Sequence, residues 1–135
     1  MQRLDTKFLF LASIMLVAGV AMGLVMAGSQ DFAMAPVHAH TNLVGWASMA
    51  LFGLTYKSYP ELQARWPAKL HFAVAAPGAL LFPVGLYLAV TRHSEGVIIL
   101  ASFAWAAGVL LFLGQMTVLA FGGGTSRASA AVPAE

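Results

Sequence analysis

The chain has 135 residues, of which 60% are hydrophobic and 9% are charged. An ordinary globular domain carries roughly 25% charged residues, so this composition excludes a soluble domain and indicates an integral membrane protein. The sequence contains no phosphate-binding loop, no nucleophile–base arrangement and no basic patch typical of nucleic-acid partners. Because cysteine is absent, disulfides, thiolate metal sites and covalent haem attachment are excluded, and any haem must be held by His or Met.

Four uncharged, apolar stretches follow one another along the chain, and each is long enough to cross a bilayer, which takes ~20 residues in a helix. Continuous apolar runs of this length favour helices over the strands of a membrane barrel. The sequence therefore predicts an all-α, integral membrane four-helix bundle in residues 1–121, followed by a flexible tail at 122–135. The predicted spans are residues 8–27, 32–56, 70–91 and 96–121.

Lys and Arg are distributed unevenly between the two sides of this predicted bundle. Six of the seven lie on the side of the termini, and Arg92 alone lies on the other. The six are Arg3, Lys7, Lys57, Arg65, Lys69 and Arg127. Because positive charges concentrate in cytoplasmic loops, we expect both termini to be cytoplasmic and Arg92 to be periplasmic. The expected location is the bacterial cytoplasmic (inner) membrane, with membrane lipid as a partner.

The first predicted span contains a Gly-xxx-Gly pair, Gly19 and Gly23. Two small residues at this spacing let membrane helices approach closely. The pair has two interpretations: it forms a dimer face, or it packs against another helix of the same bundle.

Two histidines, His38 and His40, lie near the start of the second span. An imidazole inside a membrane is costly unless it has a partner, which makes the pair a functional-site hypothesis. At ~100° per residue the two rings point to nearly opposite sides of one helix, so they are not expected to share a metal ion. They can serve two sites, or one site and one hydrogen bond. Asn42, one turn after His38, is a candidate for orienting groups on that side.

The other two histidines receive different interpretations. His93, at the periplasmic mouth, is either a solvated loop residue or a second metal ligand, from its own chain or from a partner. His71 is expected about 15 Å from His40 along the membrane normal. That separation argues against a shared haem and favours an interfacial or hydrogen-bonding role for His71. Met22, Met26 and Met34 are candidate ligands for haem iron or copper, or ordinary apolar filler.

Three elements in order carry a family resemblance between Pro36 and Leu88: a His-x-His pair, an aromatic turn with proline, and a helix opening with Lys-Leu-His-Phe. They are His38-Ala39-His40, Tyr56-Lys57-Ser58-Tyr59-Pro60 and Lys69-Leu70-His71-Phe72. This run resembles part of subunit I of the haem–copper oxidase superfamily, which includes the cbb-type oxidases and nitric oxide reductases. The resemblance implies that His38 binds a high-spin haem iron, that His40 binds a low-spin one, and that His71 is not an iron ligand. His40-Thr41-Asn42 also resembles the single-His helix of nitric oxide reductases, which is an alternative alignment.

That resemblance covers about two of the four predicted helices, and the copper-site histidines of the superfamily have no counterpart. The chain is therefore expected to be a small stand-alone relative that completes its sites by forming a homodimer. The leading hypothesis is a haem b membrane protein in electron transfer or in small-gas binding or sensing, with a quinol or cytochrome as electron donor. The alternatives are a copper-binding membrane protein that uses His38, His40, His93 and nearby Met side chains, and a cofactor-free assembly factor or small subunit of a respiratory complex.

Overall fold

The computed structural model describes residues 3–122, and every regular element in this range is helical. The prediction of an all-α fold is therefore confirmed for the described residues. Residues 123–135, with Arg127 and nearly all of the predicted tail, lie outside them. In chain order the elements are α1 (Leu4–Ser29), α2 (Ala35–His40), the π-helix η1 (Thr41–Ser48), α3 (Met49–Ser58), α4 (Pro60–Gln63), α5 (Trp66–Arg92) and α6 (Gly96–Phe121).

Three of these helices, α1, α5 and α6, are long and apolar enough to cross a membrane. Their outward faces carry large apolar side chains, such as Leu24 of α1, which is 70% exposed, and Phe103 of α6, which is 73% exposed. Exposure on this scale is unfavourable in water and suits contact with lipid. These helices begin up to four residues earlier or end up to two residues later than the apolar stretches of the sequence, because interfacial polar residues continue them.

The second predicted stretch is helical from Ala35 to Ser58, but η1 divides it into α2 and α3. Two side chains at the junction explain the change in helix type. The Thr41 hydroxyl donates to the Val37 carbonyl at 2.8 Å, and the Asn42 amide donates to the His38 carbonyl at 2.9 Å. Side-chain donors on these carbonyls compete with the α-helical ladder and favour a wider turn. Such π-helical segments often occur at functional sites, and this one directly follows His40.

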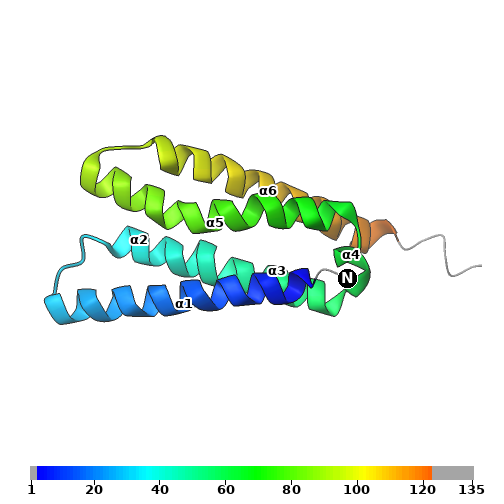
Figure 1. Ribbon diagram of the computed structural model, residues 1–135, viewed down its shortest axis with the longest axis horizontal. Helices are drawn as coiled ribbons and strands as arrows, with labels where there is room; N and C mark the ends of the chain where they lie inside the picture. Colours follow the sequence, from blue (N-terminus) through cyan, green and yellow to red (C-terminus); the bar gives the residue numbers. More distant parts are fainter. Residues whose placement is uncertain (1–2, 123–135) are drawn as a thin grey trace, which may run out of the picture.

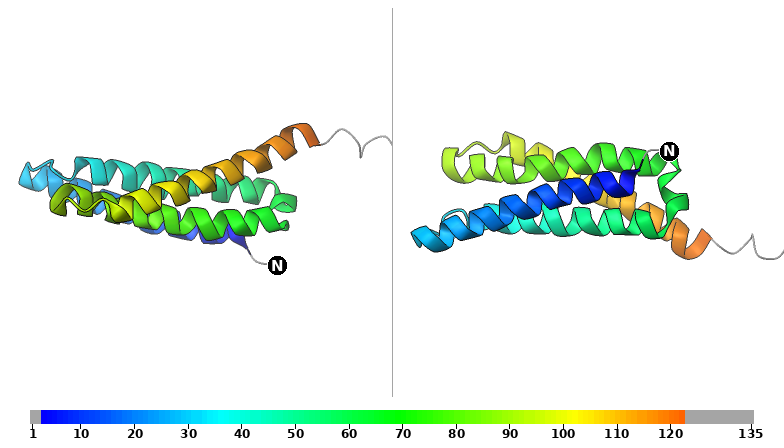
Figure 2. Two further views of the ribbon diagram at one scale, coloured as in Figure 1. Left: turned by 90° about the horizontal axis from the view of Figure 1, so that it is seen from above. Right: turned by 60° about the horizontal axis from the view of Figure 1, so that its bottom comes forward.

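The helices form two hairpins, α1 with α2–η1–α3 and α5 with α6, which α4 connects (Figure 1). α5 lies between α6 and the first hairpin, and the close packing of α5 on α6 depends on glycine. A Cβ atom on Gly85 would lie 2.5 Å from the Ile98 nitrogen, and one on Gly108 would lie 2.7 Å from the Ala75 Cβ. Seen from two further directions, the four long helical segments still run roughly side by side (Figure 2).

The two ends of this bundle differ in what they contain. The beginning of α1, the end of α6 and α4 lie at one end, and the α1–α2 and α5–α6 turns lie at the other (Figure 1). Large side chains fill the α4 end, where Phe8, Phe52, Tyr56 and His71 are buried. Five of the six basic residues grouped by the sequence also belong to segments at this end: Arg3, Lys7, Lys57, Arg65 and Lys69. The turn end carries Arg92 and the His38–His40 pair.

Candidate functional site

His38 lies on α2 and reaches across to α1. Its Nδ1 atom is 2.9 Å from the carbonyl oxygen of Gly19. Because a carbonyl can only accept, Nδ1 must carry the proton in this contact. A neutral ring protonated at Nδ1 keeps its lone pair on Nε2, which has no hydrogen-bond partner in residues 3–122. The His38 side chain is thus fixed in the tautomer that can bind a metal through Nε2.

His40 has the same tautomer through a different contact. Its Nδ1 atom is 2.8 Å from the carbonyl oxygen of Pro36, one turn earlier in the same helix. The ring stacks on Phe82 of α5, with centroids 5.0 Å apart and planes inclined by 12°. Its Nε2 atom likewise has no hydrogen-bond partner in the described part of the chain. One hydrogen bond to the backbone and one aromatic contact therefore hold the ring, and the lone pair of Nε2 stays free.

The two rings lie against different helices, His38 against α1 and His40 against α5. This arrangement agrees with the expectation that they point to nearly opposite sides of their helix. Across residues 3–122, no three His, Asp or Glu side chains come together in a way that suits a metal ion. His38 and His40 therefore do not form one metal site with His93 within a single chain.

His93 is exposed in the turn between α5 and α6, and its backbone ends α5. Its φ of 53° is left-handed, a conformation in which glycine is favoured and other residues are strained. The role that the structure shows for His93 is to terminate α5.

Gly19 and Gly23 are used inside the chain. A Cβ on Gly19 would lie 2.5 Å from both the Nδ2 and Oδ1 atoms of Asn42, and one on Gly23 would lie 3.1 Å from Cε1 of His38. The two glycines thus make room for Asn42 and for the His38 ring. Of the two interpretations of the Gly-xxx-Gly pair, packing within the bundle is the one observed, and the glycine face is not free for a dimer contact.

Asn42 was the expected orienting residue, and it lies beside His38 as predicted. Its Nδ2 atom is 3.4 Å from Nδ1 of His38 but only 2.9 Å from the His38 carbonyl oxygen. Nδ1 of His38 already donates to Gly19, so two donors face each other across the longer distance and no hydrogen bond forms there. Asn42 therefore supports the backbone of His38 and packs beside its ring.

Two adjoining cavities of about 350 Å³ each lie between α1, α2 and α5, and share Met22, Val37 and Tyr87. Met26 and Met34 line the second of these cavities together with Met22, so the three candidate methionine ligands meet in one apolar space. Neither cavity is lined by His38 or His40. The methionines therefore gather apart from the imidazoles.

A buried polar cluster at the α4 end was not predicted from the sequence. It consists of Tyr56, His71 and Gln115. The Tyr56 hydroxyl lies 2.8 Å from Nδ1 of His71, and Nε2 of Gln115 lies 2.9 Å from the Tyr56 oxygen. A chain of donors from Gln115 to Tyr56 to His71 satisfies these three atoms. The predicted hydrogen-bonding role of His71 is confirmed, but the residue is buried rather than interfacial.

The remaining nitrogen of His71 distinguishes it from the other two histidines. Its Nε2 atom is buried without a hydrogen-bond partner, while the rings of Phe8, Phe52 and Phe112 surround it. With Nδ1 accepting from Tyr56, Nε2 carries the proton and has no lone pair to offer a metal. No pattern in the sequence connects Tyr56 with Gln115, which is 59 residues away, so only the fold reveals this cluster.

Comparison of the chain with protein-family models, curated proteins and solved structures found no match.

Proposed function

We propose that this protein binds haem b through His38 and His40 in the bacterial inner membrane, in electron transfer or in binding or sensing a small gas. The hydrogen bonding of the two rings carries the proposal. Histidines that bind metals usually donate the other ring N–H to a carboxylate or a backbone carbonyl, which fixes the tautomer. Both histidines make such a bond, to Gly19 and to Pro36.

Two separate haem sites fit this pair better than one shared site, because the rings lie against different helices. The resemblance to subunit I of the haem–copper oxidases assigns the high-spin iron to His38 and the low-spin iron to His40. When bound, haem iron supplies one-electron chemistry or an open position for a diatomic gas. The protein supplies the ligand nitrogens, their orientation and an apolar surrounding that excludes water.

A homodimer completes these sites in the proposal. Within the described residues no group of three His, Asp or Glu side chains suits a metal ion, and in this proposal a second copy of the chain supplies a further iron ligand. His93 is the candidate, because it is exposed at the same end of the bundle as His38 and His40. A quinol or a cytochrome is the expected electron donor.

The proposed topology has four spans and cytoplasmic termini. The continuous helical segment from Ala35 to Ser58 is long enough to be the fourth span. The grouping of Arg3, Lys7, Lys57, Arg65 and Lys69 at one end supports a cytoplasmic position for that end. Reporter fusions near the C-terminus that score periplasmic would contradict this orientation. They would also place His38 and His40 in the cytoplasmic half of the membrane instead of the periplasmic half.

A copper-binding protein is the second candidate, favoured by the meeting of Met22, Met26 and Met34 in one cavity. Thioether sulfur is a suitable ligand for Cu(I). The same methionines also suit plain apolar packing, and no imidazole reaches that cavity, so this candidate ranks below haem.

An absorption spectrum and elemental analysis of the purified full-length protein separate the candidates. We expect a Soret band and, after reduction, a sharp α band, with iron present and copper absent. A colourless protein that contains copper would favour the second candidate. A folded protein with neither metal would contradict both and favour a cofactor-free assembly factor or small subunit.

A further inference from the structure

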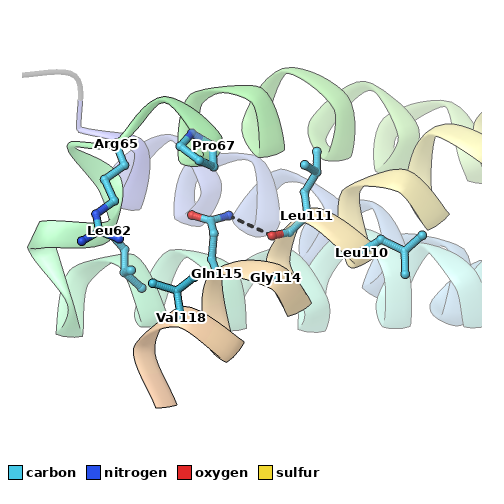
Figure 3. Close-up of a pocket in the computed structure, with 8 residues that line it drawn as sticks. All are labelled: Leu62, Arg65, Pro67, Leu110, Leu111, Gly114, Gln115 and Val118. Atoms are coloured by element: carbon cyan, nitrogen blue, oxygen red, sulfur yellow. Dashed lines mark hydrogen bonds between the residues drawn. The ribbon is translucent and has the colours of Figure 1, made fainter. Parts of the chain in front are cut away.

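A cavity of about 220 Å³ opens at the α4 end of the bundle, between the start of α5 and the last turns of α6. Figure 3 shows Arg65 and Pro67 on one side of it and Leu110, Leu111 and Val118 of α6 on the other, with Gln115 projecting between them. This cavity is distant from the His38–His40 pair, which lies toward the other end of the bundle. Its residues play no part in the proposed haem sites.

Arg65 gives this cavity an uncompensated positive charge. The only ion pair within residues 3–122 joins Arg3 to Asp5, so Arg65 has no carboxylate partner there. Lys57 and Lys69 belong to the same connecting region, which contains a single acidic residue, Glu61. An anion at the Arg65 guanidinium would therefore meet a positive field with little competition.

The rest of the cavity is apolar and opens sideways along α6. Leu110 is 66% exposed and Val118 is 48% exposed, so these walls face the surroundings of the bundle. Gln115 is the other polar side chain, and its amide already donates to the Tyr56 oxygen at 2.9 Å and contacts the Leu111 carbonyl at 3.3 Å. Gln115 therefore forms a satisfied floor, and Arg65 is the group left to recognise a ligand.

We propose that this cavity binds one anionic phospholipid, with the phosphate at Arg65 and an acyl chain along Leu110, Gly114 and Val118. An arginine fork matches phosphate oxygens, and basic pockets between membrane helices are suited to anionic headgroups. The apolar slot beside the charge favours a lipid over a free phosphate. This inference rests on the proposed membrane insertion and is independent of haem binding.

Native mass spectrometry of the full-length protein, released from detergent micelles, tests this site. With phosphatidylglycerol added, we expect one retained lipid per chain. With phosphatidylcholine, whose phosphate charge is offset by a choline cation, we expect about tenfold weaker retention, because that cation is repelled by Arg65 and the neighbouring basic residues. Glycerol phosphate, which carries the anion without the acyl chain, should not displace the lipid. Equal retention of both lipids, or displacement by glycerol phosphate, would overturn the proposal.

Two variants and two matched controls locate the binding. Arg65→Gln should reduce phosphatidylglycerol retention about tenfold, whereas Lys57→Gln, which removes a charge at the same end, should reduce it far less. Gly114→Leu should fill the slot and also reduce retention. A Cβ at Gly114 meets nothing within 4 Å, and the same is true of Gly28 at the other end, so Gly28→Leu controls for the added side chain.

Each outcome of these comparisons decides the question. Equal losses in Arg65→Gln and Lys57→Gln would indicate diffuse attraction to anionic lipid and overturn a built site. Unchanged retention in Gly114→Leu would exclude the slot as the place of the acyl chain. The haem spectrum is recorded on the same samples, so failure of the lipid site and failure of haem binding are told apart.

Discussion

The three histidines inside the bundle differ in how their ring nitrogens are bonded. Two of them, His38 and His40, lie toward the turn end, and His71 lies toward the α4 end. His38 and His40 donate through Nδ1 to backbone carbonyls, which leaves a lone pair on Nε2. His71 accepts through Nδ1 from Tyr56, and its Nε2 is enclosed by aromatic rings. The partner of one nitrogen therefore separates candidate ligands from a histidine that organises the core.

His71 also differs from His38 and His40 in its surroundings. His71 is fully buried in a cluster with Phe8, Phe52 and Tyr56, whereas His38 and His40 are only half-buried. Close packing leaves no space for a ligand around His71. The half-buried imidazoles and the π-helical segment that follows them are where the proposal places haem and a second copy of the chain.

The largest expected effect comes from replacing the two candidate ligands separately. If the proposed haem sites exist, His40→Ala should abolish the sharp α band of the reduced protein, because the low-spin iron would lose a ligand. His38→Ala should spare that band and abolish binding of carbon monoxide, because it would remove a ligand from the other iron. Absorption spectra with and without carbon monoxide measure both effects. Spectra identical to wild type in both variants would exclude both residues as ligands.

Gly19→Leu should have the next largest effect, through the support of His38. A side chain at this position would overlap Asn42, which lies 2.5 Å from the position of the added Cβ atom. Displaced Asn42 would push on the His38 ring and disturb its hydrogen bond to the Gly19 carbonyl, and losing such an orienting bond costs about 10–100-fold in metal affinity. Carbon monoxide titration of the reduced protein measures this loss, with Gly28→Leu as the control.

The same variant tests the role of the glycine pair. Because Gly19 packs inside the chain, Gly19→Leu should affect the haem site more than dimerisation. Native mass spectrometry that finds monomers while the haem spectrum stays intact would contradict this reading and restore the dimer-face interpretation.

The sequence predicted much of the fold because continuous apolar runs define membrane helices by length alone. It also predicted the divergence of His38 and His40, which follows from the ~100° step of a helix. It did not predict η1, since the widened turn depends on Thr41 and Asn42 bonding to backbone carbonyls. Nor could it place Asn42 over Gly19 or join Tyr56 to Gln115, because these contacts exist only after the helices pack.

A substitution at the α4 end is expected to lower the stability of the protein moderately and to leave its haem absorption spectrum unchanged. Tyr56→Phe removes the hydroxyl that both His71 and Gln115 contact, which leaves Nδ1 of His71 without a partner and the Gln115 amide with only its longer contact to the Leu111 carbonyl. The cost should be about 1–2 kcal/mol of unfolding free energy, since hydrogen bonds in membrane bundles are worth at most about that much. Unfolding in mixed detergent micelles measures the loss. A variant that keeps its stability but loses haem would reverse the assignment of the two ends.

His93→Gly should have the smallest effect on stability and still be informative about the site. Glycine adopts the left-handed φ of 53° without strain, so the variant should be as stable as wild type or up to ~1 kcal/mol more stable. Loss of the low-spin band in this variant could then not be attributed to misfolding. If the His93 of a second copy completes a haem site, the band should weaken and the dimer should dissociate more readily, as native mass spectrometry would detect. An unchanged band and an unchanged dimer would leave His93 with helix termination alone and require the missing axial ligand to come from elsewhere.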